Sequence, residues 1–281
     1  MKPSRTFALT GRTVLVTGAA SGIGAATSRA LDAAGANVVL VDLHQVPLDE
    51  LATSLGSRTL PVAADVTDGA AMESVVAAAV ARFGSLDVCF ANAGIAAASP
   101  TTIPSSSVEE FERIIEVDLL GVWRTVRACL PEITKAGGHV LVTSSVYAFF
   151  NGTGNAPYAM SKAGVESFGR SLRGELAGTG TTAGVLYPGW VSTPIIKASR
   201  QGHPAAQKLI RLANPGPFGT PVTPERIARA VVQGIEDRSA RIICPRRWAP
   251  VSAARGVVNI LGDVVVDRSR RMQSLIRQLD K

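Results

Sequence analysis

The stretch Thr13-Val-Leu-Val-Thr17-Gly18-Ala-Ala-Ser-Gly22-Ile-Gly24 decides the fold of this 281-residue chain. Residues 13–17 form a short apolar run rich in β-branched side chains, which is typical of a buried strand. The glycines that follow allow a tight turn and a close approach of the backbone to a pyrophosphate. The helical pattern of residues 25–34 comes next, and the start of a helix attracts such an anion. A second strand over residues 37–41 completes a strand–helix–strand unit of the length that binds a dinucleotide.

An acidic residue ends this second strand. Asp42 lies about 20 residues beyond the glycines, where a carboxylate can accept hydrogen bonds from an adenosine ribose. The same charge would repel the 2′-phosphate of NADP. Ser21 and Leu43 stand where a basic residue would hold that phosphate, so the sequence predicts NAD rather than NADP. His44 favours NADP instead, because a protonated imidazole there would attract the 2′-phosphate.

Tyr158 and Lys162 stand four residues apart in a segment, residues 155–177, that has a helical pattern. Side chains at this spacing share one face of a helix and can meet. A lysine cation beside a phenol favours the phenolate, so we expect the pKa of Tyr158 to lie below its ordinary value of about 10. Such a pair can transfer a proton near neutral pH. The structural alternative is a packed ring beside a solvated charge.

Apolar runs and helical patterns alternate along the rest of the chain. Further strands are predicted at residues 59–63, 88–91, 139–143, 182–187 and 241–243, and helices at 69–83, 108–135, 155–177 and 224–236. This alternation predicts a Rossmann-like α/β fold, a doubly wound parallel sheet of about seven strands flanked by helices. Ligands then bind at the carboxyl ends of the strands. We assign residues 1–245 to one such domain.

Motifs in a fixed order make residues 10–245 resemble the short-chain dehydrogenase/reductase family. They are Thr17-Gly18-x-x-x-Gly22-x-Gly24, Asp65 in Ala64-Asp65-Val66, Asn92-Ala93-Gly94, Ser145 thirteen residues before Tyr158, Tyr158-x-x-x-Lys162, and Pro188-Gly189 with Thr193. The resemblance implies hydride transfer between a nicotinamide and a carbinol carbon. It assigns proton transfer to Tyr158, stabilisation of the phenolate and a ribose contact to Lys162, and orientation of the substrate oxygen to Ser145.

One position departs from the family pattern. Asp118 stands in the long helix where relatives have an asparagine, whose main-chain carbonyl is thought to hold a water that relays protons to the lysine. An aspartate keeps that carbonyl, so we expect the relay to be retained and count Asp118 among the catalytic residues. It also adds a negative charge near Lys162.

Two sets of site residues follow from the strand ends and the resemblance. The predicted cofactor site comprises Gly18, Ser21, Gly22, Ile23, Gly24, Asp42, Leu43, Asp65, Val66, Asn92, Ala93, Gly94, Tyr158, Lys162, Pro188, Gly189, Val191 and Thr193. The predicted substrate residues are Ser145, Tyr147, Phe149, Phe150, Tyr158 and Trp190. Trp190 opens the segment 190–218, and long segments of this kind often act as lids. Apolar side chains here favour a hydrophobic substrate, such as a steroid, a lipid-derived alcohol or an aromatic ketone, or else pack against the body of the protein.

Composition narrows the class of protein. Hydrophobic residues make up 46% of the chain, ample for a large core, but no run of eighteen apolar residues predicts a spanning helix. The basic N-terminus lacks the apolar segment of a secretory signal. Three widely separated cysteines indicate a reducing cytoplasm without disulfides, and the three histidines show no metal-ligand spacing, so we expect no metal.

Basic charge is concentrated in residues 241–281. This segment has nine Lys+Arg and three Asp+Glu, a net charge of +6 out of +7 for the chain. Apolar residues form a roughly helical stripe at Val257, Leu261, Val265, Met272, Leu275 and Leu279, although Gly256 and Gly262 weaken the helix prediction. We expect this extension, residues 246–281, to pack on its own protein or oligomer. Peripheral contact with an anionic membrane is the alternative, and nucleic-acid binding is not expected.

The leading interpretation is a cytoplasmic NAD-dependent oxidoreductase that acts on a hydrophobic secondary alcohol or its ketone. The alternatives are an NADPH-preferring carbonyl reductase and, hinted at only by Asp118, a catalytically impaired nucleotide-sensing or membrane-docking protein. The resemblance also implies a homodimer or homotetramer, with the helices at residues 108–135 and 155–177 at one interface.

Overall fold

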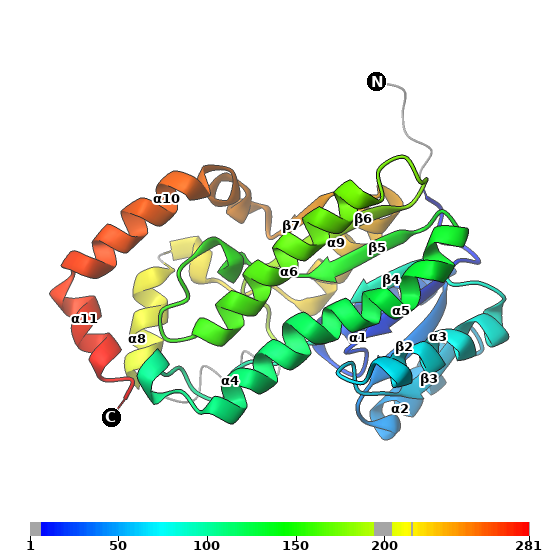
Figure 1. The fold of residues 1–281 in the computed structure, drawn as a ribbon, viewed down its shortest axis with the longest axis horizontal. Coiled ribbons are helices and arrows are strands. Elements are labelled where there is room, and N and C mark those ends of the chain that lie inside the picture. Colours follow the sequence, from blue (N-terminus) through cyan, green and yellow to red (C-terminus); the bar gives the residue numbers. More distant parts are fainter. Residues whose placement is uncertain (1–6, 194–203, 215, 281) are drawn as a thin grey trace.

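A parallel sheet of seven strands, in the order β3-β2-β1-β4-β5-β6-β7, lies at the centre of the molecule (Figure 1). The structure is a computed structural model that describes residues 7–193, 204–214 and 216–280. The strands are β1 (Thr13–Thr17), β2 (Asn37–Asp42), β3 (Thr59–Ala63), β4 (Val88–Ala91), β5 (His139–Thr143), β6 (Thr182–Pro188) and β7 (Arg241–Cys244). Every neighbouring pair of these strands is parallel, so the predicted fold class is confirmed.

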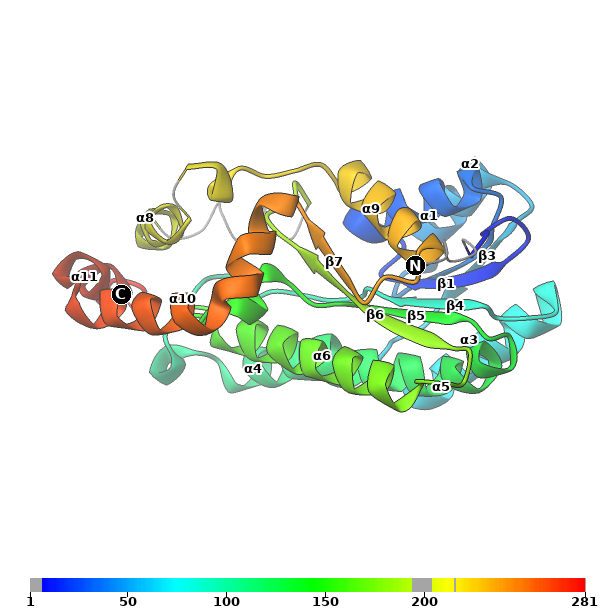
Figure 2. The same ribbon diagram turned by 90° about the horizontal axis from the view of Figure 1, so that it is seen from above.

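Helices cover both faces of the sheet, as Figure 2 shows. One face carries α1 (Gly22–Ala33), α2 (Gln45–Leu55) and α9 (Pro224–Glu236), and the other carries α3 (Gly69–Phe83), α4 (Val108–Ile115), α5 (Gly121–Lys135) and α6 (Ala156–Glu175). Because both faces are covered, every residue of β1, β4 and β5 is buried, which explains their continuous apolar runs. Helix α2 was not predicted, since only Leu48 and Leu51 are buried on it and two residues make no stripe.

The helix predicted over residues 108–135 contains a π turn. Residues Glu116–Leu120 form this turn between α4 and α5, and the backbone stays helical through it. A π turn adds one residue to the helical repeat and often marks a functional site. Here it carries Asp118, whose side chain is fully buried.

The chain ends in two helices that lie beside the sheet. Helix α10 (Ala249–Arg268) runs along the edge of the molecule, continuous through both glycines, and α11 (Arg270–Arg277) turns back onto α8 (Pro204–Ala213) (Figure 1). Leu275 and Leu279 pack there against Ala205 and Leu209. Part of the extension therefore packs on its own protein, and the glycines do not interrupt the helix.

A buried carboxylate ties the beginnings of β1 and β4 together. Asp87 is 3% exposed and accepts hydrogen bonds from the Thr13 N–H at 2.9 Å and the Ser85 hydroxyl at 3.0 Å. It also forms an ion pair with Arg12. Without this acceptor the buried Thr13 N–H would lose its partner.

We expect Asp87→Ala to lower the free energy of unfolding by about 1–3 kcal/mol, because it leaves the buried N–H of Thr13 without an acceptor, while the loss of the half-exposed Arg12 pair adds little. Chemical denaturation of the purified protein measures this value. The control is Asp237→Ala, an exposed carboxylate that accepts one hydrogen bond from Gln233 and should change stability by less than about 0.5 kcal/mol. Equal effects of the two substitutions would contradict the role of Asp87.

Candidate active site

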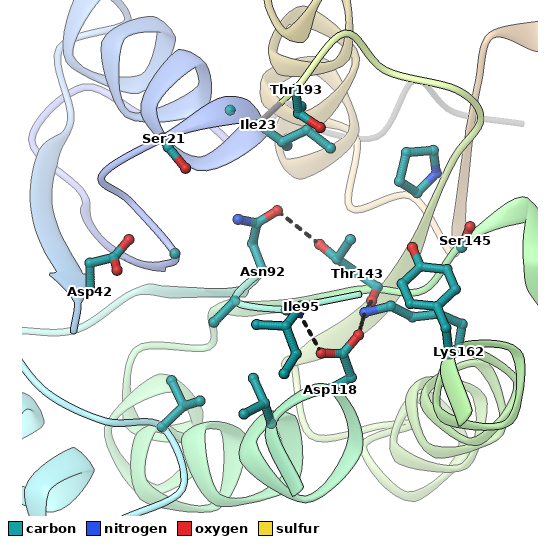
Figure 3. Close-up of a pocket in the computed structure, with 18 of the residues that line it drawn as sticks. Ser21, Ile23, Asp42, Asn92, Ile95, Asp118, Thr143, Ser145, Lys162 and Thr193 are labelled. Carbon is teal, nitrogen blue, oxygen red and sulfur yellow. Dashed lines mark hydrogen bonds and ion pairs between the residues drawn. The ribbon is translucent and has the colours of Figure 1, made fainter. Parts of the chain in front are cut away.

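A cleft of about 320 Å³ opens at the carboxyl ends of the strands (Figure 3). All the predicted cofactor residues except Gly24 line it, from the glycine loop after β1 to Thr193 after β6. Its size lies within the range of small-molecule sites. The structure therefore gathers these residues, which follow different strands, around one cleft.

Gly24 does not line the cleft but lies against the backbone of the glycine loop. A Cβ atom at this position would lie 1.9 Å from the carbonyl oxygen of Gly18, so only glycine lets α1 begin this close to the turn. Helix α1 starts at Gly22 and directs the N–H groups of its first turn toward the cleft. This cradle fits a phosphate group, which the helix dipole also favours.

Two carboxylates lie farther along the cleft, beyond β2 and β3. Asp42 accepts hydrogen bonds from the N–H of Ala20 at 2.9 Å and of Leu43 at 2.8 Å, so it also holds the glycine loop in place. Asp65 accepts from the N–H and the hydroxyl of Thr67 at 2.8 and 2.7 Å, and pairs with Arg113 at 3.5 Å. Although burial favours the neutral carboxyl, Thr67 and Arg113 outweigh it and lower the pKa of Asp65.

Asn92 joins three strand ends. Its side-chain amide donates to the carbonyl of Thr17 at 3.0 Å, and the Thr17 hydroxyl accepts from the N–H of Asn92 and of Ala93, each at 3.0 Å. The Thr143 hydroxyl donates to the Asn92 side chain at 3.4 Å. These bonds hold the floor of the cleft rigid between β1, β4 and β5.

Lys162 lies almost wholly inside the protein, with 2% of its surface exposed. Its ammonium group forms an ion pair with Asp118 at 3.0 Å and donates to the carbonyl of Thr143 at 3.4 Å (Figure 3). The second carboxylate oxygen of Asp118 accepts from the N–H of Ile95 at 2.7 Å. The π turn thus brings a carboxylate to Lys162, where an asparagine would offer only an amide.

This carboxylate changes the acidity of its neighbours. Burial raises the pKa of Asp118, against the opposing charge of Lys162. Burial by itself would lower the pKa of Lys162. The charges of Asp118 and Tyr158 outweigh burial, so the pKa of Lys162 is raised. Burial, reinforced by Asp118, raises the pKa of Tyr158 despite Lys162 and a hydrogen bond with Ser145. The predicted lowering of the Tyr158 pKa is therefore wrong, because it considered the lysine without the burial of the phenol, which is the largest effect, and without the opposing charge of Asp118.

A smaller apolar pocket of about 90 Å³ adjoins the cleft and shares Ser145, Tyr158 and Gly189 with it. The ring of Tyr147 stands edge-on to Tyr158, with centroids 5.6 Å apart, and to Trp190, with centroids 5.9 Å apart. Four of the predicted substrate residues, Ser145, Tyr147, Tyr158 and Trp190, line this pocket. Its other lining residues are Ala96, Ala97, Pro100, Val146, Thr153, Gly154, Asn155, Leu209 and Ile210.

The two remaining predicted substrate residues point elsewhere. Phe149 is 1% exposed and packs on Tyr187 at a centroid distance of 5.3 Å, and Phe150 packs on Trp248 at 5.8 Å. Both contribute to packing and neither lines the pocket. Of the segment 190–218, residues 194–203 and 215 lie outside the described residues, while Leu209 and Ile210 reach the pocket from α8.

Several residues of the site were not predicted. Thr17, Thr143 and Ser144 hold the strand ends, and Ser144 donates to the carbonyl of Lys162 at 2.7 Å. The sequence could have indicated Thr143 and Ser144 as site residues, because their hydroxyls lie at a strand end in the run Thr143-Ser144-Ser145. For Arg113 no local pattern gives a signal, because its partner Asp65 lies 48 residues away.

We expect Asp118→Asn to lower the pKa of Tyr158, because it removes a negative charge that opposes the phenolate. Titration by the ultraviolet absorbance of tyrosinate measures this pKa when the spectra of variants that also carry Tyr158→Phe are subtracted. Glu116→Gln, an acid with a half-exposed side chain in the same turn, is the control and should leave the titration unchanged. An unchanged or higher Tyr158 pKa in Asp118→Asn would contradict the proposed electrostatic influence.

Comparisons with known proteins agree with this geometry. Residues 12–204 match the family model for short chain dehydrogenases. The chain is 35% identical over 236 residues to cis-4-hydroxycyclohexanecarboxylate dehydrogenase of Sinomonas cyclohexanicum, covering 83% of this chain and 92% of that protein. It is 38% identical to 1-deoxy-11-beta-hydroxypentalenate dehydrogenase of Streptomyces avermitilis, over 66% of this chain and 70% of the relative.

Solved structures show the same likeness. Levodione reductase has a TM-score of 0.77 at 29% identity, over 84% of this chain and 96% of its own. A short chain dehydrogenase/reductase from Burkholderia phymatum in complex with NAD has a TM-score of 0.78 at 25% identity, over 94% of this chain and 97% of its own. With its sheet order, glycine loop and matched family model, the chain belongs to the short-chain dehydrogenase family, and it is an oxidoreductase for alcohol or ketone groups.

Proposed function

We propose that this protein is an NAD-dependent dehydrogenase that interconverts a hydrophobic secondary alcohol and its ketone. The observation that supports this most is the position of Tyr158, at the junction between the cleft and the apolar pocket and beside a buried lysine. A substrate in the small pocket would have its oxygen beside Tyr158 and Ser145. The nicotinamide of NAD, when bound, supplies the acceptor or donor of the hydride.

Tyr158 is the proposed proton-transfer group. Its hydroxyl donates a proton to the oxygen formed on reduction, or as phenolate removes the hydroxyl proton on oxidation. Ser145 shares a hydrogen bond with Tyr158 and accepts one from the Tyr147 N–H at 3.1 Å, which fixes its hydroxyl at the pocket entrance. From there it orients the substrate oxygen and stabilises charge that develops on it.

Lys162 stabilises the phenolate form of Tyr158, and Asp118 moderates this effect. Because the ion pair with Asp118 neutralises part of the lysine charge, Tyr158 holds its proton to higher pH than the lysine alone would allow. A retained proton suits reduction, in which Tyr158 is the acid. Oxidation requires the phenolate and is therefore expected to rise toward alkaline pH.

Two observations support NAD as the cofactor. Asp42 directs a carboxylate into the cleft, and its neighbour there is the apolar Leu43. The cations among the described lining residues are Lys162 and Arg113, and each pairs with an aspartate, Asp118 and Asp65. The cleft thus offers a 2′-phosphate no uncommitted cation, whereas Asp42 can accept hydrogen bonds from ribose hydroxyls.

The pocket supports a compact apolar substrate. Its lining combines the rings of Tyr147 and Trp190 with small and aliphatic side chains, and the part of it that the structure describes includes no lysine or arginine. A hydroxyl-bearing ring fits such a space, and the Sinomonas relative is named for a hydroxycyclohexane compound. Unlike that compound, the substrate proposed here is uncharged, because the described lining residues include no cation that would pair with a carboxylate.

We also propose that the enzyme forms a homodimer or homotetramer through the outer faces of α5 and α6. Trp123 on α5 and Met160 on α6 are 42% and 55% exposed, and Leu120 in the π turn is 37% exposed. Apolar side chains of this size on one layer of helices are typical of subunit contacts.

We expect Tyr158→Phe to lower kcat by at least about a hundredfold, since it removes the proton-transfer group while keeping the ring. The assay follows nicotinamide absorbance with a panel of cyclic and aromatic secondary alcohols, and binding of NADH is measured by its fluorescence. Binding should change by less than about twofold, because Tyr158 contributes one contact among many in the cleft.

The matched control is Tyr187→Phe, a buried tyrosine outside both pockets that packs on Phe149. It should retain activity. Substantial turnover by Tyr158→Phe would refute the assignment of the acid–base group. A wild-type protein that binds NADH yet oxidises no alcohol and reduces no ketone would instead favour the nucleotide-sensing alternative.

Cofactor choice is tested separately. We expect Asp42→Ala to reduce the ratio of NAD to NADP efficiency by at least about tenfold, since it removes both a ribose acceptor and a charge that repels the 2′-phosphate. Steady-state kcat/KM for the two cofactors gives the ratio. Glu50→Ala, an exposed residue on α2 with the same change of charge, should leave it unaltered. A wild-type preference for NADP would favour the carbonyl reductase alternative.

A further inference from the structure

Helix α10 carries a stripe of exposed aliphatic side chains. Val257, Ile260, Leu261, Val264 and Val265 are between 38% and 66% exposed. Their spacing of three and four residues places them on one face of the helix. In Figures 1 and 2 this helix runs along the periphery of the molecule. Single exposed aliphatic residues are ordinary, but a continuous row of five requires an explanation.

Two polar residues of α10, Arg255 and Asp263, contact the body of the protein. Arg255 donates to both carboxylate oxygens of Glu166 on α6, each at 2.7 Å, and Glu166 is 4% exposed. Asp263, two turns along, accepts from the side-chain amide of Asn151 at 2.8 Å. An amphipathic helix on a globular protein normally buries its apolar side. Here the contacts of Arg255 and Asp263 hold α10 so that its aliphatic stripe faces outward.

Basic residues lie at both ends of the stripe. Arg246 is exposed just before α10, and the exposed Arg268, Arg270 and Arg271 follow the stripe where α10 meets α11. The exposed acidic residues of α10, Asp263 and Asp267, are outnumbered by them. Residues 241–281 as a whole carry +6 of the net charge of +7. An apolar stripe between arginines has the charge complementarity that an anionic lipid surface requires.

We propose that α10 docks flat on an anionic membrane surface, with its aliphatic stripe in the interfacial layer and the flanking arginines against lipid headgroups. Residues 246–268 are also long and apolar enough to cross a membrane, judged by length and composition alone. Crossing would break the Arg255–Glu166 pair and take Arg255 and Asp263 into hydrocarbon, which is costly. Lying flat keeps both contacts and immerses only the stripe.

A second copy of the chain is the competing occupant of this face. Two α10 helices that pack side by side, in either direction, would bring the arginines at their ends together. Like charges in such an interface oppose association. The same arginines are attracted to an anionic bilayer. We therefore favour the membrane over a second copy as the occupant of this face.

Vesicle flotation with the full-length protein tests the proposal. We expect binding to phosphatidylcholine vesicles that contain phosphatidylglycerol, little binding to phosphatidylcholine alone, and release at high salt. The double substitution Ile260→Gln/Leu261→Gln and the triple substitution Arg268→Gln/Arg270→Gln/Arg271→Gln should each weaken partitioning by at least about tenfold. All these side chains are exposed, so the variants should fold, and circular dichroism and thermal melting verify this.

The matched control is Val46→Gln/Val108→Gln, which changes two equally exposed valines, 68% and 64%, on α2 and α4. It should bind vesicles as the wild type does. Absence of wild-type binding to anionic vesicles, or equal binding by all variants, would overturn the proposal. So would an Ile260→Gln/Leu261→Gln protein that sediments as a smaller oligomer without any change in vesicle binding, since the stripe would then be a subunit contact. None of these readouts uses the enzyme's activity, so the outcome is independent of the proposed reaction.

Discussion

A lysine cation buried inside a protein must find compensating charge and acceptors, and the arrangement of this site follows from that need. Lys162 finds the carboxylate of Asp118 and the carbonyl of Thr143. To supply them, the end of β5, the π turn and the segment after β4 have to meet at one point. Gly94 completes the fit, because a Cβ atom there would lie 3.2 Å from the ammonium nitrogen. Rigid strand ends and one irregular turn of helix thus position the proposed proton-transfer group.

Much of this could be predicted from the sequence, for a physical reason. Strands buried on both faces are uniformly apolar, and parallel strands collect their carboxyl ends at one edge, so residues that follow strands share a site. Gly18, Asp42, Asn92 and Ser145 follow this rule. The direction of the Tyr158 pKa does not, because it depends first on how deeply the phenol is buried and then on Asp118, which a π turn brings close. Neither the burial nor the turn has a local signature in the sequence.

The aromatic pair Phe149 and Phe150 and the C-terminal extension show a second limit. Hydrophobicity indicates that a side chain is covered or that it binds something, but it does not say which. Phe149 is covered by Tyr187, whereas the stripe on α10 faces outward. Helical spacing predicts the stripe only in part: Val257, Leu261 and Val265 face outward on α10, whereas Met272, Leu275 and Leu279 pack inward toward α8. Its orientation is decided by Glu166, a residue on another helix, and such a partner is visible only in three dimensions.

The packing of α11 on α8 also orders the events of biosynthesis. The cleft for the nucleotide is lined by residues up to Thr193, so its whole lining leaves the ribosome well before the last helices. Leu209 and Gly154, which line the smaller pocket, are backed by Leu275 and Leu279. A nascent chain therefore contains the described lining residues of the cleft before it contains the helices that support the wall of the smaller pocket. The wall of the smaller pocket is therefore among the last parts of the molecule to gain its support during synthesis.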